Sequence, residues 1–216
     1  MNITYSHDIG LQEDIKTFPA SFSQQRLWFL HQWNPEHSHY ITALLLRMDG
    51  EFHQEAFERS LNEIVQRHEI LRTTFAVIEE QLTQVVAPGL TLPLSVLDRQ
   101  HIPQKEWEAE TLRVARQEAQ QPFDLTQGPL MRAVLLQFAP EKHFLILVAH
   151  QIIFDTWSTG VFLQELAVLY QAHSADQSAH VPALPIQYAD FTLQQQEWLH
   201  QDTIAPHLAY WKQFLQ

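Results

Sequence analysis

Hydrophobic positions along the chain alternate between short apolar runs and stretches with helical spacing. The short runs predict buried strands. The stretches that repeat apolar side chains every three or four positions predict helices packed on those strands. We therefore expect an α/β fold with a single mixed β-sheet and packed helices. The expected strands include 41–48, 130–138 and 143–149, and the expected helices include 53–70, 104–120 and 158–172.

Weaker patterns surround this framework. Residues 74–78 and 81–86 predict the two strands of a hairpin joined through Glu79 and Glu80. Residues 1–18 are polar with little periodicity, which predicts an N-terminal arm ahead of a folded unit over 19–216. The chain shows no long linker, so this unit is expected to be one large domain or two tightly joined ones.

Charge and composition narrow the function classes. The chain of 216 residues carries 13 Lys and Arg against 25 Asp and Glu, a net charge of −12. This balance argues against a nucleic-acid binder and against attachment to an anionic membrane surface. Cysteine is absent, which excludes disulfide and thiolate chemistry and fits a reducing compartment. Since no signal sequence or membrane-length apolar run appears, we expect a cytoplasmic protein.

The stretch 142–173 places polar side chains between a predicted strand and a predicted helix. His150, Gln151 and Asp155 fall in the turn that joins them, at the end of a strand where a pocket can form. A histidine at this place is more often a buried core residue than a catalytic one. The amide of Gln151 can donate and accept hydrogen bonds but cannot act as a general base. The sequence shows no spacing typical of a metal site.

Four segments resemble the motifs of condensation domains of nonribosomal peptide synthetases, which belong to the chloramphenicol-acetyltransferase-like acyltransferases. HQIIFDTWS at 150–158 resembles HHxxxDGWS, and SFSQQRLW at 21–28 resembles SxAQxRLW. RHEILRTTF at 67–75 matches RHExLRTxF, and PFDLTQGPL at 122–130 matches PFDLxxGPL. Because the motifs recur in order, the resemblance covers nearly the whole chain.

The resemblance implies that residues 19–216 are the N-terminal lobe of a two-lobe fold, and that the condensation domain is truncated. In that family the phosphopantetheine arms of two carrier proteins meet in a tunnel between the lobes, and no cofactor is bound directly. The implied partners are a peptidyl or aminoacyl carrier protein or a neighbouring synthetase domain. A lobe without its second half exposes surface that is normally covered, so we also expect a possible homodimer.

The resemblance also assigns roles within the turn. In the family the second histidine of the signature positions or deprotonates the attacking amine, and here that position is Gln151. His150 matches the first, largely structural histidine, and Thr156 replaces the usual glycine. Asp155 matches the aspartate that forms a structural salt bridge. Its expected partner is Arg67, with Arg132 and Arg72 as alternatives.

Two functional hypotheses follow, and an unrelated binding module remains as a third class. The first is a truncated condensation-type domain, inactive alone in peptide-bond formation, with a structural role or a role in carrier or domain interaction. The alternative is an active acyltransferase half-domain completed by a second lobe or another copy, in which Gln151 orients the substrate.

Overall fold

The computed structural model describes residues 14–34, 40–200 and 204–215. Their strands form a four-stranded sheet in the order β2-β7-β6-β5 and a three-stranded sheet in the order β1-β4-β3. The strands are β1 (Lys16–Pro19), β2 (Ile41–Asp49), β3 (Thr73–Ile78), β4 (Gln81–Val86), β5 (Leu94–Asp98), β6 (Met131–Ala139) and β7 (Lys142–His150). The helices are α1 (Phe22–Trp33), α2 (Gln54–Arg67), η1 (Glu69–Arg72), η2 (Gln104–Glu106), α3 (Trp107–Gln120), α4 (Thr156–Ser174), α5 (Tyr188–His200) and α6 (Ile204–Phe214).

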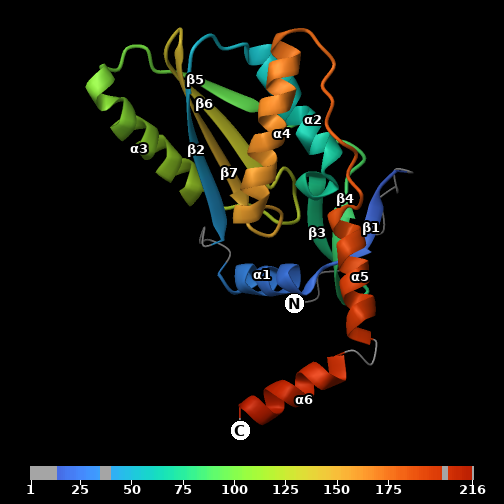
Figure 1. Cartoon of the computed structure of the whole chain (residues 1–216). Helices are drawn as coiled ribbons and strands as arrows, with labels where there is room; N and C mark the ends of the chain where they lie inside the picture. The colour runs from blue at the N-terminus through green and yellow to red at the C-terminus, as the bar shows by residue number, and fades with distance from the viewer. Residues whose placement is uncertain (1–13, 35–39, 201–203, 216) are drawn as a thin grey trace, which may run out of the picture.

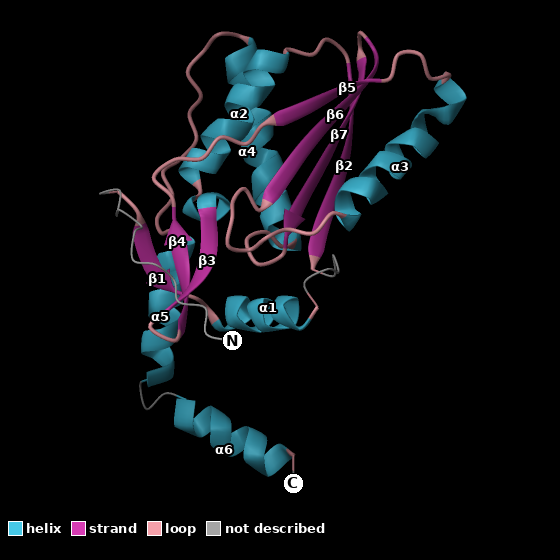
Figure 2. Ribbon diagram, turned by 180° about the vertical axis from the view of Figure 1, so that it is seen from behind, coloured by secondary structure: helices cyan, strands magenta, loops and turns pink. Residues whose placement is uncertain are grey.

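The four-stranded sheet forms the centre of the molecule. β7 pairs antiparallel with β2 and β6, while β5 runs parallel to β6, so the sheet is mixed. Figures 1 and 2 show α2 and α4 on one face of this sheet and α3 on the other. Because both faces are covered, every residue from Leu145 to Ala149 is buried, and β7 forms a continuous apolar run instead of alternating. The expected α/β fold and its three expected central strands are confirmed.

The expectation of a single sheet is wrong. β3 and β4 form the predicted hairpin, with φ angles of 49° and 65° at Glu79 and Glu80, as a tight two-residue turn requires. This hairpin pairs with β1 and not with the central strands. β1 begins at Lys16, inside the stretch predicted as an arm, and residues 1–13 lie outside the described residues. Hydrophobic periodicity identifies strands but does not show which strands pair. β1 is too short and too polar to show a periodic pattern at all.

The two sheets are connected through loops and through α1. The backbone N–H of Phe75 on β3 donates to the carbonyl oxygen of Leu125, in the loop that precedes β6, at 2.9 Å. α2 ends at Arg67, earlier than predicted, and the tight turn η1 leads directly into β3. Figure 1 shows α5 beside β1 and α6 set apart from the rest of the molecule. Within the described ranges, no helix combines the length and apolar character needed to cross a membrane.

The packing where the two sheets meet predicts that substitutions at two positions on β3 differ strongly in their effect on stability. Phe75 is completely buried, whereas Val77 on the same face of β3 is 59% exposed. We expect Phe75→Ala to lower the free energy of unfolding by about 3–5 kcal/mol because it leaves a cavity. Val77→Ala should change it by less than about 1 kcal/mol. Chemical denaturation measures both, and equal losses would contradict the packing described here.

Candidate functional site

The turn between β7 and α4 is compact and is held by its own backbone. The carbonyl oxygen of His150 accepts hydrogen bonds from the N–H groups of Ile153 and Phe154, at 3.1 and 3.2 Å. Residues 152–154 are buried, while Gln151 and Asp155 on either side are exposed. The turn therefore separates the signature into an internal apolar segment and two solvent-facing polar positions.

His150 is part of the core. The residue is 3% exposed, and its Nδ1 accepts a hydrogen bond from the N–H of Ile152 at 3.1 Å. The proton of the neutral ring therefore resides on Nε2. Burial lowers the pKa of His150 to about 4, with a smaller contribution from His31, whose ring packs edge-on at a centroid distance of 5.7 Å. His150 is thus neutral near pH 7 and has the geometry of a structural histidine.

Gln151 stands at the position that the resemblance aligns with the second histidine of the family motif. Its backbone N–H donates to the carbonyl oxygen of Tyr40 at 2.7 Å, which fixes the turn to the residue before β2. Its side chain is exposed. The amide can donate a hydrogen bond to a polar substrate group or accept one from it, but it cannot take up a proton near neutral pH.

The predicted ion pair of Asp155 is wrong. Asp155 is the N-cap of α4, and its carboxylate accepts hydrogen bonds from the N–H of Ser158 at 2.8 Å and from its hydroxyl at 2.6 Å. The hydroxyl bond is the main reason that the pKa of Asp155 lies below its usual range. No ion pair joins this carboxylate to Arg67, Arg72 or Arg132, all within the described ranges. Because the side chain is exposed, solvent and the helix end replace the expected arginine.

Thr156 shows why the missing glycine does not disturb the turn. It is the first residue of α4, and the positive-φ residues of the described chain lie elsewhere. A helical backbone conformation accepts a β-branched side chain without left-handed strain.

Arg67 is paired instead with a buried carboxylate on α4. Its Nε lies 3.1 Å from Oε1 of Glu165, and Nε2 of His68 lies 2.7 Å from Oε2 of the same carboxylate. Glu165 was not predicted as a site residue. The sequence does contain a signal for this residue. Glu165 falls on the apolar face of the predicted helix at 158–172, next to Phe162 and Leu166, where a buried charge needs a partner.

The two alternative arginines also have other partners. Nη2 of Arg72 lies 3.4 Å from Oε1 of Glu69. Nε of Arg132 lies 3.5 Å from the carboxylate of Glu118, and its guanidinium carbon lies 3.8 Å from the ring centroid of Phe123. Burial lowers the pKa of Arg132, with Glu118 opposing the shift. Both arginines therefore act in the framework and not at the turn.

A buried glutamine pair links the turn to the smaller sheet. Nε2 of Gln24 on α1 lies 3.2 Å from Oε1 of Gln84 on β4 and 3.4 Å from the carbonyl oxygen of Ile152. Both glutamines are 1% exposed. Sequence reasoning missed these two residues. Gln24 stands at the glutamine position of the SxAQxRLW-like motif, and this was the signal available.

An apolar hollow of about 730 Å³ opens beside the turn. It lies between the end of α2, the first turns of α4 and the chain that leads into α5. Its walls are mostly aliphatic and aromatic, with His68, Ser158 and Gln187 among the polar groups. Trp157, 84% exposed, borders it. The described residues contain no group of three His, Cys, Asp or Glu side chains placed to hold a metal ion.

The family model of the condensation domain matches residues 14–216. The chain belongs to the condensation-domain family. This condensation-family chain is 42% identical over 197 residues to a linear gramicidin synthase polypeptide of Brevibacillus parabrevis, covering 91% of the chain but 2% of that protein. It is 36% identical over 201 residues to phosphinothricin tripeptide synthetase PhsC of Streptomyces viridochromogenes, covering 93% of the chain and 18% of that protein.

Solved structures give the same fold. The starter condensation domain of rhizomide synthetase RzmA superposes with a TM-score of 0.82 at 24% identity, over 92% of the chain and 50% of that structure. The X-domain from teicoplanin biosynthesis, solved in complex with OxyB, gives a TM-score of 0.80 at 27% identity, over 92% of the chain and 43% of that structure. The chain thus spans about half of a solved condensation domain with the chloramphenicol-acetyltransferase-like fold.

The N-cap geometry predicts a modest stability effect for Asp155. We expect Asp155→Ala to lower the free energy of unfolding by about 1 kcal/mol, the usual value of an N-cap. Loss of one partner of a buried ion pair would instead cost about 3–5 kcal/mol. Asp155→Asn, which keeps an oxygen acceptor for the N–H of Ser158, should retain most of the stability. Denaturant titration distinguishes these two values. A loss of about 3–5 kcal/mol in the free energy of unfolding would contradict the capping role.

The burial of His150 predicts a pH dependence. Its pKa of about 4 in the folded chain lies below the ordinary value of 6.5, so the unfolded chain binds more protons between these values. The stabilisation it gives should be complete above about pH 6.5 and should be lost as the pH falls toward 4. His150→Asn, whose amide oxygen can replace Nδ1 as acceptor, should remove this part of the pH dependence. Imidazole NMR titration with a pKa near 6.5 for His150 would contradict the assignment.

Proposed function

We propose that this chain is the first lobe of a condensation domain from a nonribosomal peptide synthetase, and that alone it does not form peptide bonds. In this proposal it has a structural role, or it serves as a binding surface for a carrier protein or a neighbouring domain. The observation that carries the proposal is the pair of residues at the end of β7. His150 is buried, neutral and already hydrogen-bonded, and Gln151 has no basic group.

The extent of the likeness supports a half-domain. The chain covers 50% of the rhizomide starter condensation domain. The resemblance implies that both lobes of the fold contribute to the tunnel. On this proposal the chain lacks the part of the tunnel that a second lobe contributes, so it does not form the complete site.

Exposed aromatic side chains support a role in association. Trp33 on α1 is 81% exposed, Trp157 at the turn 84%, and Phe214 on α6 68%. On α6 the ring of Phe214 lies 6.0 Å from that of Tyr210 and 5.8 Å from that of Trp211, and both of these side chains are also exposed. A contiguous exposed apolar patch of this kind commonly marks an interaction site. The X-domain relative is found in a complex with the protein OxyB, so a protein partner on this fold has a precedent. For this chain we favour a carrier protein or synthetase domain, with a homodimer as the second possibility.

The phosphopantetheine arm of a carrier would be brought by that partner. The arm is a flexible chain with two amides. The exposed amide of Gln151 in the turn and the exposed ring of Trp157 in the first turn of α4 offer matching hydrogen-bonding and apolar groups. Gln151 would orient such an arm or its substrate without removing a proton.

The alternative is an acyltransferase completed by a second lobe or another copy, and one observation favours it. The turn between β7 and α4 is ordered, and the side chain of Gln151 is exposed there. Gln151 could therefore orient a substrate at the position where the resembled family carries its catalytic histidine.

A condensation assay separates the two functions. Donor and acceptor carriers loaded with aminoacyl groups are mixed with the chain, and with the longest native polypeptide that contains it. We expect the unsubstituted protein to give no dipeptide above the level of the carriers alone. The same result is expected for Gln151→Ala and for the control Gln100→Ala, which lies on an exposed loop. Carrier binding, measured by calorimetry, should persist. Product formation that Gln151→Ala abolishes and Gln100→Ala leaves intact would establish the alternative.

A further inference from the structure

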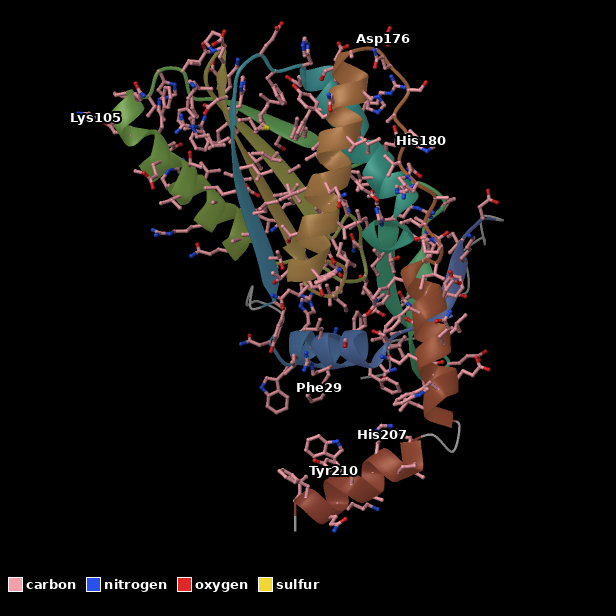
Figure 3. The ribbon with its side chains drawn as sticks, in the orientation of Figure 1. Phe29, Lys105, Asp176, His180, His207 and Tyr210 are labelled. Atoms are coloured by element: carbon pink, nitrogen blue, oxygen red, sulfur yellow. The ribbon has the colours of Figure 1, made fainter. Side chains whose placement is uncertain are left out.

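The segment between α4 and α5, residues 178–186, crosses the end of α2 with few polar attachments; we call it the strap. Figure 3 shows Asp176 at the end of α4 and His180 on the strap as it descends beside α2. Within the described part of the chain, the strap residues form no hydrogen bonds between backbone groups. Ala179 and Val181 pack partly against the core, and Leu184 and Ile186 line the apolar hollow beside the signature turn.

Arg67 provides the polar attachment of the strap. Its Nη2 donates to the carbonyl oxygen of Pro182, while its Nε is held by Glu165 at 3.1 Å. The side chains of Arg67 and Glu165 are 18% and 11% exposed, so solvent competes weakly for this pair. Glu165 binds Nε of the guanidinium and thereby orients its plane, and in this orientation Nη2 points at the strap.

The end of the strap has a separate anchor. The side chain of Gln187 accepts from the N–H of Glu69 and donates to the carbonyl oxygen of Arg67, both at 3.0 Å. This fixes the point at which the strap enters α5. The stretch between Gln187 and the end of α4 is then held by Arg67 and by its apolar contacts.

We propose that the strap is a lid over the apolar hollow and that Arg67, oriented by Glu165, is its latch. A segment with no backbone ladder and one polar attachment opens at a lower free energy than the helices around it. Opening removes the side of the hollow formed by Leu184 and Ile186, and leaves the side formed by Ile153 and Phe154 of the turn. The latch thereby controls access to the hollow. This inference does not depend on whether Gln151 takes part in a reaction.

The test uses the absence of native cysteine. Ala183→Cys, at an exposed strap position, carries a nitroxide spin label whose mobility reports whether the strap is docked. We expect Arg67→Lys, which can keep its charge beside Glu165 but lacks the second arm, to shorten the correlation time of the label severalfold. Glu165→Gln should have the same effect. The control is Arg99→Lys, which alters another partly buried pair, with Glu110 at 2.9 Å, and should leave the label unchanged.

Access to the hollow is measured with the neutral apolar dye N-phenyl-1-naphthylamine. Association should be severalfold faster in the two latch variants than in the parent or Arg99→Lys. Val161→Trp, which fills the hollow from α4, should abolish dye binding and so locate it. If Glu165→Gln does not fold by circular dichroism, Arg67→Lys decides the result alone. Label mobility and dye association equal to the parent in every folded latch variant would overturn the proposal, and neither readout involves condensation activity.

Discussion

The fold depends on hydrogen-bond satisfaction where its two sheets meet. The sheets share no strand, so no continuous backbone ladder crosses between them. Their junction is made instead by the side chains of Gln24 and Gln84 and by single backbone bonds such as that from Phe75 to Leu125. An unsatisfied buried polar group costs about 1–3 kcal/mol, so each of these contacts restricts where the neighbouring elements can lie. The burial that makes an unpaired amide costly also makes the pairing of these amides specific.

Contacts at this junction also hold the turn between β7 and α4, which carries the motif residues 150–158. Gln24 binds the carbonyl oxygen of Ile152, Tyr40 receives the N–H of Gln151, and Leu130 receives the N–H of His150. The turn is therefore held from three separate parts of the chain. Its first histidine supplies an internal acceptor and is kept neutral by burial. The exposed neighbouring position is under no such constraint, which explains how Gln151 can replace a histidine without disturbing the fold.

The elements with long, clear periods could be predicted from the sequence, because burial on one or both faces imposes a pattern that needs no partner. β7 and α4 are examples, and their boundaries differ from the expected ones by a few residues at most. β1 could not be found, since four residues of mixed character carry no period and owe their strand to pairing with β4. For the same reason the second sheet was missed. At the site, the identity of the turn residues was predictable, while the partner of Asp155 required distances that sequence spacing does not contain.

The misplaced ion pair shows how burial, and not order along the chain, decides where a charge needs a partner. A carboxylate after a buried strand was expected to be buried, but the turn brings Asp155 to the surface, where the first turn of α4 supplies its donors. The carboxylate that is withdrawn from solvent is Glu165, further along the same helix, and it takes Arg67 and His68. Both come from the RHExLRTxF-like motif, so this motif joins α2 to α4 and to the strap. A motif match thus fixes a position in the fold, whereas the role of each side chain follows from the groups that surround it.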